Sequence, residues 1–322
     1  MAARRTSGSG QGTVASADDR VRAAWLYHVE GLTQEKVART MKVSRARVIR
    51  LLAAARDAGV VRIRIDAKGT GEIALERRLV GELGLQEAVV VPSPMEDAMV
   101  ATAVGQAAGT YIADQIRDGM SLGVGWGSTL SMSLKAIGTQ TCQRVSVISL
   151  LGGMTHSRAV NPSAVARRMA DLLAADCYQL TAPVFVANEA TRVALWKEPG
   201  LRELRARARR VDLALVSVGD LAADATLFRE GLLPRSQRAS LIAAGAVGDV
   251  LCHFLDAGGR MVDHPVNRRV VAVDLEDLRR VPKIVIAAGG RRKVAAIKAA
   301  LGATGAKVLI TDEAAARRLL AD

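Results

Sequence analysis

The chain has 322 residues, of which half are hydrophobic and only 3% aromatic, and it carries a formal net charge of +13. This length is enough for two domains, whose cores must be built mainly from Ala, Val, Leu and Ile. The three cysteines are widely spaced and form no Cys-x-x-Cys pair, which argues against a disulfide framework or a cysteine zinc site and indicates a reducing compartment.

The N-terminal segment and the apolar segments argue against export and membrane insertion. Residues 1–17 are rich in Ser, Gly and Arg and lack the apolar core of a signal peptide, so we interpret them as a disordered arm. No uncharged apolar run reaches the roughly 18 residues that a transmembrane helix needs. We therefore expect a soluble, cytoplasmic protein without a membrane partner.

The positive charge is concentrated in the first part of the chain. Residues 1–70 contain 14 Lys or Arg and 6 Asp or Glu, a net charge of +8, whereas the other 252 residues contain 31 and 26, a net charge of +5. Basic regions attract polyanions because binding releases condensed counterions. The distribution therefore favours nucleic acid as a partner of this region.

Residues 31–59 predict two short helices joined by a tight turn. Thr33 is placed to cap the first helix, whose first turn begins at Gln34. Ser44 is placed to cap the second helix, and Gly59 ends it as a residue that adopts positive φ readily. Apolar residues recur at helical spacing in both segments, so each helix has a side for a common core.

The second of these helices has one apolar side and one basic side. Its apolar residues leave Ala46 and Arg50 on the free side and Arg47 on their flank. Such a helix fits the major groove of DNA, where Arg can bond guanine or a phosphate. The alternative is an ordinary helical hairpin with a solvated basic face. We interpret the segment as a helix-turn-helix and predict that it contacts DNA through Thr33, Gln34, Ser44, Arg45, Ala46, Arg47 and Arg50.

Two flanking segments would complete a winged helix-turn-helix domain over residues 18–67. A preceding helix is expected to turn one side toward the core, with Val21, Ala24, Trp25 and His28. Residues 60–66 alternate with period two and predict a strand. This strand is either the wing, with Arg62 and Arg64 near phosphates, or a strand with a solvated basic face.

Residues 68–322 alternate between apolar strands and helices, which predicts an α/β domain. Strands are expected at residues 88–91, 121–124, 145–151, 178–181, 213–218, 270–273, 284–287 and 308–310. Helices are expected at residues 72–83, 97–117, 128–136, 162–174 (with Asn161 as N-cap), 292–301 and 313–320. Continuous apolar strands separated by helices indicate a doubly wound, largely parallel sheet, which binds ligands at the carboxyl ends of its strands.

The segment Gly125-Trp126-Gly127-Ser128-Thr129 runs from one of these strands directly into a helix. Glycines let the backbone approach a ligand closely, and the start of the helix offers free N–H groups beside two hydroxyls. The segment is neither a Walker loop nor a Rossmann fingerprint, because the required Lys and the last Gly are missing. It fits a phosphate or the hydroxyls of a sugar or polyol, although a glycine-rich turn can also serve packing alone.

Two further glycine-rich loops follow strands. Gly152 and Gly153 come directly after the strand that ends at residue 151. Gly289 precedes a helix whose first turn contains Lys293. A lysine opposes the helix dipole there, a cost that is understandable if an anion or a polar ligand binds at the same end.

Three polar residues outside these loops are also candidates. Asp249 lies on a glycine-flexed turn, where it could grip sugar hydroxyls or act as a turn aspartate. Asn267, near Pro265, is a further candidate for the same ligand. Asp312 follows a strand and precedes a helix, and we interpret it as an N-cap.

In this order the segments resemble the SorC family of sugar-binding bacterial transcriptional regulators. The resemblance covers nearly everything after residue 18 and rests on the helix-turn-helix, residues 125–129, Leu151-Gly152-Gly153, residues 245–249, Asn267, Gly289-Gly290 with Lys293, and Thr311-Asp312-Glu313. It implies a winged helix-turn-helix and an effector domain related to phosphosugar isomerases. It also implies a homo-oligomer, dimer or tetramer, that releases or re-disposes DNA when a sugar or phosphosugar binds. Within the family the sequence looks closest to regulators of the erythritol type.

One position departs from part of that family. Members that sense deoxyribose phosphate carry a lysine immediately before the Gly-Gly, and this lysine forms a Schiff base with the effector. The corresponding residue here is Leu151, which cannot do so. Reversible hydrogen bonding is therefore the expected mode of effector binding.

The sequence thus predicts an effector-responsive transcription factor of a sugar or polyol operon, with no catalytic residues, metal or cofactor. The effector, a sugar, polyol or their phosphate, would be held by Gly125, Trp126, Gly127, Ser128, Thr129, Gly152, Gly153, Asp249, Asn267, Gly289 and Lys293. A rival interpretation is a phosphosugar isomerase with an accessory DNA-binding module, but we identify no Glu or His paired with Asp249 in the sequence to share proton transfer. A third is a protein-interaction hairpin joined to a non-catalytic sensor.

Overall fold

The computed structural model describes residues 17–61, 69–138, 142–155 and 160–321. Close contacts divide the chain into two units, residues 1–65 and residues 66–322, and each is described by itself. The predicted arm, residues 1–17, lies outside the described residues except for Ala17. Among the residues that the structure describes, no helix combines the length and apolar character that crossing a bilayer requires.

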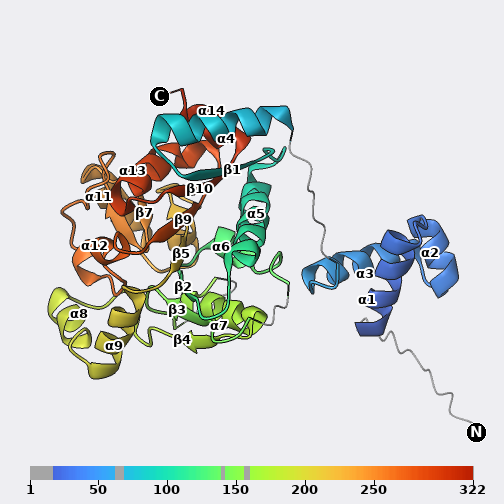
Figure 1. The fold of residues 1–322 in the computed structure, drawn as a ribbon, viewed down its shortest axis with the longest axis horizontal. Helices are drawn as coiled ribbons and strands as arrows, with labels where there is room; N and C mark the ends of the chain where they lie inside the picture. The colour runs from blue at the N-terminus through green and yellow to red at the C-terminus, as the bar shows by residue number, and fades with distance from the viewer. Residues whose placement is uncertain (1–16, 62–68, 139–141, 156–159, 322) are drawn as a thin grey trace, which may run out of the picture. The chain divides into compact units, whose positions relative to one another are not determined.

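The smaller unit is built from three helical segments around one apolar cluster. Helix α1 (Ala17–Ala24) continues into a π-helical turn, η1 (Trp25–Val29), and is followed by α2 (Gln34–Met41) and α3 (Arg45–Asp57). The cluster at their centre comprises Ala23, Ala24, Leu26, Val37, Ala38, Val48, Leu51, Leu52 and Ala55. The two helices predicted for residues 31–59 are therefore present and share one core (Figure 1).

Both predicted N-caps of this hairpin are formed. The Thr33 hydroxyl accepts a hydrogen bond from Lys36 N at 3.3 Å, and the Ser44 hydroxyl accepts one from Arg47 N at 3.2 Å. Such a bond satisfies one of the free N–H groups at a helix start. Between the helices Lys42 adopts φ of 54°, which turns the chain sharply. The local sequence therefore sets where the second helix begins.

The orientation predicted for the first helix is wrong in part. Ala24 is buried as expected, but Val21 and Trp25 are half exposed or more, and His28 is exposed as well. The chain widens from α-helical to π-helical geometry at Trp25, so the side chains that follow are rotated relative to a regular helix. Leu26 occupies the place in the core that was predicted for Trp25. The strand predicted for residues 60–66 lies almost entirely outside the described residues.

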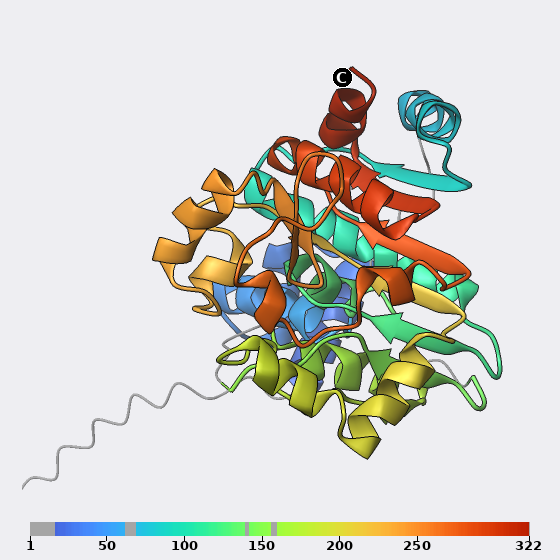
Figure 2. The same cartoon turned by 90° about the vertical axis from the view of Figure 1, so that its left-hand side faces the viewer.

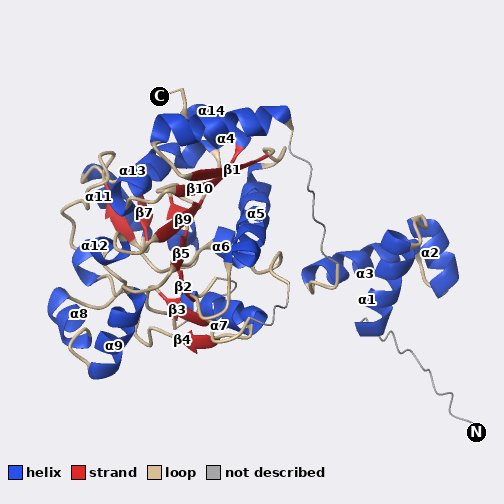
Figure 3. Cartoon of the chain, in the orientation of Figure 1, coloured by secondary structure: helices blue, strands red, loops and turns tan. Residues whose placement is uncertain are grey.

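The larger unit contains a seven-stranded sheet in which every neighbouring pair is parallel. Its strands are β1 (Glu87–Val91), β2 (Ser121–Val124), β3 (Ser146–Ser149), β4 (Asp176–Tyr178), β5 (Leu213–Val216), β9 (Lys283–Ala287) and β10 (Val308–Asp312). Their order is β1-β10-β9-β5-β2-β3-β4. The predicted doubly wound, largely parallel sheet is confirmed (Figure 3).

Helices cover both faces of this sheet. Residues of α5 (Val100–Gln115), α6 (Ser128–Ser133) and α7 (Pro162–Leu173) share one apolar cluster with one face. The other face packs against α4 (Thr70–Leu83), α9 (Pro199–Ala208), α12 (Leu275–Leu278), α13 (Val294–Thr304) and α14 (Glu313–Leu319). Alternate residues of one strand enter the two clusters, as in β9, where Ile284 and Ile286 face one cluster and Val285 and Ala287 the other.

The structure adds elements that the sequence pattern did not indicate. A small antiparallel sheet is formed by β6 (Val218–Gly219), β7 (Gly248–Val250) and β8 (His253–Leu255). Strands of two or three residues are too short to show a period of two. The short helices α8 (Glu189–Leu195), α10 (Thr226–Arg229) and α11 (Arg235–Ala243) were also not predicted.

Two predicted strands need correction. Residues 270–273 are not part of a sheet and make only single bridges, Phe185 with Val270 and Leu151 with Ala272. The strand predicted at residues 178–181 is β4, two residues earlier in the chain. Residues 270–273 are apolar because they are buried, which by itself does not require pairing in a ladder.

Helices α5 and α6 are in direct backbone contact, and this contact depends on two glycines of α5. A Cβ atom added to Gly109 would lie 2.1 Å from Ser133 O, and one added to Gly105 would lie 2.4 Å from Thr129 O. Helix α6 carries Ser128 and Thr129 in its first turn. The close packing of α5 therefore fixes the position of that turn.

We expect Gly109→Ala to destabilise the protein by about 2 kcal/mol, because overpacking a tight contact typically costs this much. The sign is the opposite of the usual one, since Gly to Ala inside a helix normally stabilises by about 0.5–1 kcal/mol. Gly81→Ala in α4 is the matched control, because a Cβ atom there meets nothing within 4 Å. Urea unfolding of both variants measures the difference, and equal effects would contradict the proposed contact.

Candidate functional site

A cavity of about 440 Å³ opens at the carboxyl ends of the strands of the large sheet. Its walls come from residues that follow β2, β5 and β9, from the 3-10 turn η2 (Asp97–Met99), and from β7 and α10. The chain leaves β2 and β5 in opposite directions along the sheet, since β3 lies beside β2 and β9 beside β5. Parallel α/β sheets bind ligands at such a switch point.

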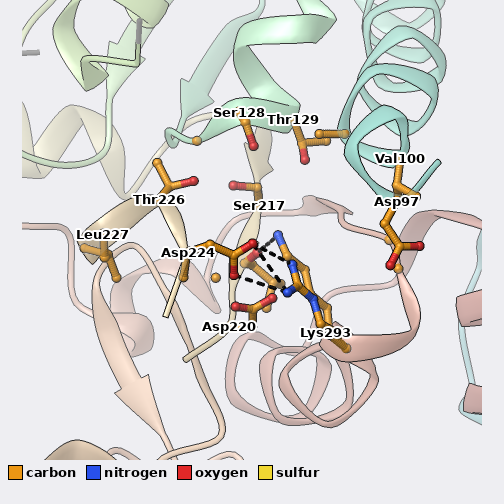
Figure 4. A pocket seen from close by; sticks show the side chains of 18 of the residues that line it. Asp97, Val100, Ser128, Thr129, Ser217, Asp220, Asp224, Thr226, Leu227 and Lys293 are labelled. Carbon is orange, nitrogen blue, oxygen red and sulfur yellow. Dashed lines mark hydrogen bonds and ion pairs between the residues drawn. The ribbon is translucent and has the colours of Figure 1, made fainter. Parts of the chain in front are cut away.

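The segment after β2 forms one wall of this cavity. Trp126, Gly127, Ser128 and Thr129 line it, and Ser128 and Thr129 face the cavity in Figure 4. Gly127 has φ of +120°, and a Cβ atom on it would lie 2.7 Å from the hydroxyl oxygen of Ser217. The Ser217 hydroxyl donates to Trp126 O. The glycine is therefore required both by its backbone conformation and by a close neighbour.

A buried acid, Asp249, and a half-buried base, Lys293, line the cavity. Asp249 is 3% exposed, and its Oδ2 accepts a hydrogen bond from Cys252 N at 3.0 Å. Its Oδ1 is buried and, among the residues that the structure describes, has no hydrogen-bond partner. The ammonium of Lys293 donates to Val218 O at 2.8 Å. Of the described residues that line the cavity, Asp249 alone has a buried carboxylate oxygen without a hydrogen-bond partner.

The pKa values of this pair reflect their burial. Burial raises the pKa of Asp249 to about 7, against the opposing effects of the Cys252 N–H and of Lys293. Burial lowers the pKa of Lys293, although Asp220 and Asp249 favour its charged form. Near neutral pH Asp249 is therefore only partly ionised and can both donate and accept hydrogen bonds.

We expect the stability of the protein to fall as Asp249 loses its proton. The folded protein holds this proton more tightly than the unfolded chain, where the pKa is 3.8, so the stabilisation is present at low pH and is lost as the pH rises toward 7. With the shift to about 7, the wild type should lose about 2 kcal/mol more than Asp249→Asn between about pH 5.5 and about pH 8. Chemical unfolding at both pH values measures this, with the exposed Asp263→Asn as control. Equal losses in wild type and Asp249→Asn would contradict it.

An exposed ion pair lies at the outer part of the cavity. Arg292 NH1 is 3.2 Å from Asp224 Oδ1, and both side chains are more than half exposed. The hydrogen bond from Arg292 is the main reason that the pKa of Asp224 is lowered. Figure 4 shows Asp224 beside Asp220 and Lys293, opposite Ser128 and Thr129. The cavity therefore offers hydroxyls on one side and alternating carboxylates and cations on the other.

Four residues predicted for the effector site do not line the cavity. Asn267 uses its amide to bond the backbone, accepting from Phe254 N and donating to Phe254 O and Val262 O. A Cβ atom on Gly152 would lie 2.5 Å from Ala182 O, so this glycine serves packing, and Gly153 is paired with Pro183 beside it. Gly125 packs against Leu251. Gly125, Gly152, Gly153 and Asn267 therefore lie outside the lining of this cavity.

The structure keeps Trp126, Gly127, Ser128, Thr129, Asp249, Gly289 and Lys293 at the cavity and adds lining residues that sequence reasoning missed. The additions with polar side chains are Asp97, Ser217, Asp220, Asp224, Thr226, Arg229, Arg291 and Arg292. Ser217 and Asp220 follow β5, so the rule that placed the site at strand ends could have found them. Asp224 and Thr226 lie in a segment without a recognisable pattern.

The smaller unit presents a separate basic surface on α3. Arg45, Ala46 and Arg50 are exposed, and within residues 17–61 the structure shows no ion pair for either arginine. Arg47 is less exposed and is 3.3 Å from Asp19 Oδ2. Thr33 and Ser44 cap helices, and Gln34 is half-buried. The outward side predicted for this helix is therefore present, with Arg47 turned toward α1.

Comparison with known proteins gives consistent matches over almost the whole chain. A family model described as "Putative sugar-binding domain" matches residues 68–321. The erythritol catabolism regulatory protein EryD of Brucella abortus is 32% identical over 311 residues, 95% of this chain and 98% of that protein. The deoxyribonucleoside regulator of Bacillus subtilis is 32% identical over 308 residues, 94% of this chain and 97% of that protein.

Solved structures show the same fold. The full-length sorbitol operon regulator SorC from Klebsiella pneumoniae superposes with a TM-score of 0.71 at 24% identity, over 94% of this chain and 100% of that chain. The sugar-binding domain of a transcriptional repressor from Vibrio fischeri gives a TM-score of 0.71 at 25% identity, over 77% of this chain and 98% of that chain. Together with the capped helix-turn-helix and the cavity at the strand ends, these matches show that the chain belongs to the SorC family of sugar-binding transcriptional regulators.

Proposed function

We propose that this regulator binds an operator through Arg45, Ala46 and Arg50 of α3 and senses a small polyhydroxylated effector in the cavity after β2, β5 and β9. The observation that supports the first half is the capped helix with two exposed arginines that have no ion pair in the described part of the unit. Such arginines can reach base edges and phosphates. Thr33, Gln34, Ser44 and Arg47 would orient the helix at the DNA backbone.

For the effector we propose a sugar, a polyol or one of their phosphates, held by reversible hydrogen bonds. The support is the lining, in which the Ser128 and Thr129 hydroxyls face carboxylates and cations across a cavity of about 440 Å³. Vicinal hydroxyls both donate and accept, so they can bond Asp249 and Lys293 together. Regulators named for erythritol catabolism and for deoxyribonucleosides are among the relatives, which fits an effector of this size.

The effector would act by binding one arrangement of the protein more tightly than another, since a ligand shifts an equilibrium only through such a difference. We propose that the regulator acts as a homo-oligomer, a dimer or a tetramer, because paired half-sites need two recognition helices. Whether the effector acts as an inducer or a co-repressor depends on whether the arrangement that it stabilises is the one that binds the operator.

We propose a sensor without catalytic turnover. The cavity is lined by a buried acid and a half-buried lysine, which could serve in proton transfer, so the enzymatic alternative has a specific feature in its favour. The relatives, however, are named as transcriptional regulators. Incubation of the purified protein with ribose 5-phosphate or glucosamine 6-phosphate should give no product, and turnover would overturn this part of the proposal.

The proposal is tested by operator binding and effector binding in the same protein. A thermal-shift screen of sugars, polyols and their phosphates should identify a ligand that raises the melting temperature, because it binds only the folded protein. Fluorescence anisotropy with DNA from upstream of the gene should then show a change in operator affinity on adding that ligand. Salt-insensitive or absent DNA binding would contradict the regulator assignment of α3.

A further inference from the structure

We propose that Asp312 is a positioning residue that fixes the wall of the effector cavity and links it to the helix pair α4–α14. The inference rests on the proposed function for the meaning of the cavity, but not for the geometry. Asp312 is the last residue of β10, is 1% exposed and stands at the N-cap position of α14. Contrary to the interpretation as an N-cap, its side chain makes no capping bond to that helix.

The Asp312 carboxylate instead joins two loops that are far apart in the sequence. Its Oδ1 accepts a hydrogen bond from Gly290 N at 2.6 Å, and its Oδ2 accepts one from the Ser93 hydroxyl at 2.6 Å. Gly290 begins the turn η4 (Arg291–Lys293), and Ser93 lies in the loop that leads from β1 to Asp97. Gly290 and Asp97 both line the cavity. One buried carboxylate therefore sets the position of two of its walls.

Gly289, which precedes the residue that bonds Asp312, must be a glycine because the backbone there passes so close to the Asp312 carboxylate. A Cβ atom on Gly289 would lie 2.6 Å from Asp312 Oδ1, and Gly290 has φ of +94°. The turn can thus come near enough to donate to the carboxylate only because both residues lack a side chain. Three residues later Lys293 enters the cavity, so its position depends on where the turn is held.

Ser93 extends the connection to helix α14. Its hydroxyl oxygen also accepts a hydrogen bond from Ala314 N at 2.7 Å, in the first turn of that helix. Ser93 thus supplies the capping bond that Asp312 does not. Helix α14 packs against α4, and the two lie side by side near β1 (Figure 1 and Figure 2). Helix α4 is the first described element that follows the DNA-binding unit in the chain.

Both oxygens of Asp312 must accept for this arrangement to hold. An asparagine would keep one acceptor for Gly290 N, but its NH₂ group would face a Ser93 hydroxyl that needs an acceptor. The two loops would then be held less firmly, and movement of the cavity wall would no longer be passed to α14. Loss of this coupling between the cavity wall and α14 would distinguish a positioning role of Asp312 from a role in packing alone.

The first experiment measures hydrogen exchange of the full chain by mass spectrometry, without DNA or ligand, in wild type, Asp312→Asn and Glu313→Gln. Glu313 is the neighbouring residue, pairs with Arg317 and touches neither loop in the contacts shown, so it is the matched control. In Asp312→Asn we expect about tenfold faster exchange in peptides covering residues 289–294 and 92–98, a smaller increase in α4, and no change in β2 and β5. Changes confined to the first turn of α14, or equal to those of the control, would overturn the proposal.

A second variant separates the two halves of the connection. Ser93→Ala removes only the bridging hydroxyl, so exchange should rise in residues 92–98 and in α4 while residues 289–294 change less. If α4 does not respond to Ser93→Ala, the link to the helix pair is refuted. D-erythritol 4-phosphate serves as the effector probe for operator affinity. If it alters the operator affinity of wild type, it should alter that of Asp312→Asn much less, and an equal response would also overturn the link.

The outcomes of the hydrogen-exchange tests are independent of the proposed function. Hydrogen exchange reports on the loops whether or not the protein binds DNA or a sugar. If the exchange results hold and neither the operator nor any polyol binds, the proposed function fails while the positioning role of Asp312 stands. If DNA and effector bind normally but exchange in residues 289–294 is unchanged, the positioning role fails alone.

Discussion

Replacing Gly127 by Asp is expected to abolish effector binding. The native φ of +120° at this position suits glycine, and any Cβ atom would lie 2.7 Å from the Ser217 hydroxyl oxygen. The substitution also places a carboxylate on a wall that faces Asp220 and Asp224. We expect affinity for the ligand found in the thermal-shift screen to fall at least about 100-fold, or about 3 kcal/mol. Isothermal titration calorimetry measures this directly.

The matched control for this change is Gly119→Asp. Gly119 also has positive φ, +78°, but it lies in an exposed turn before β2, and a Cβ atom there meets nothing within 4 Å. Its affinity for the ligand should be that of wild type. Operator binding without ligand should be unchanged in both variants, which shows that they are folded. A Gly127→Asp protein that still binds the ligand tightly would place the effector elsewhere.

Removing the two outward arginines of α3 should have a comparably large effect on operator binding. Arg45 and Arg50 are exposed and make no ion pair within residues 17–61, so their guanidinium groups need not leave a partner to reach DNA. We expect Arg45→Ala combined with Arg50→Ala to weaken binding about 100-fold or more and to reduce the salt slope by about 2. Fluorescence anisotropy at several salt concentrations measures both quantities.

Arg56→Ala is the control on the same helix. Arg56 is also exposed, but it lies in the last turn of α3, whereas a recognition helix contacts base edges with the residues near its N-terminus. Its removal should change affinity only slightly. If Arg56→Ala and the double variant weaken binding equally, the DNA contact depends on overall charge and not on the arginines in the first two turns of α3.

The strands and the caps could be predicted because their causes are local. Strand β2 was predicted with its observed bounds, and Asn161 accepts the predicted capping bond, from Ser163 N at 3.2 Å. Apolar runs and capping residues act on neighbours within a few positions. Gly127 could be predicted for the same reason, because a glycine-rich turn from a strand into a helix is recognisable in the sequence. The structure places this residue at the cavity.

Residues whose partners are distant in the sequence could not be placed from the sequence. Asn267 was predicted to bind the effector, but its amide bonds Phe254 and Val262. Arg292 and Asp224, 68 positions apart, were not foreseen as a pair. Trp25 was predicted to face the core, and only the π-helical turn that begins there shows why Leu26 replaces it. The role of a polar residue depends on its partners, and partners that are distant in the sequence become known only from the fold.

The sequence by itself thus determined the parallel sheet, the helix-turn-helix and the strand ends where a ligand site should be sought, because periodicity and capping are encoded over short stretches. Only the tertiary structure decided which side chains meet in the cavity. It brought Asp249 and Lys293 to one cavity, and it placed the Asp312 carboxylate, at the expected N-cap position, so that it bonds two loops instead of capping the helix. The physical reason is that burial and long-range hydrogen bonds change what a carboxylate does, and neither is a property of the residues beside it.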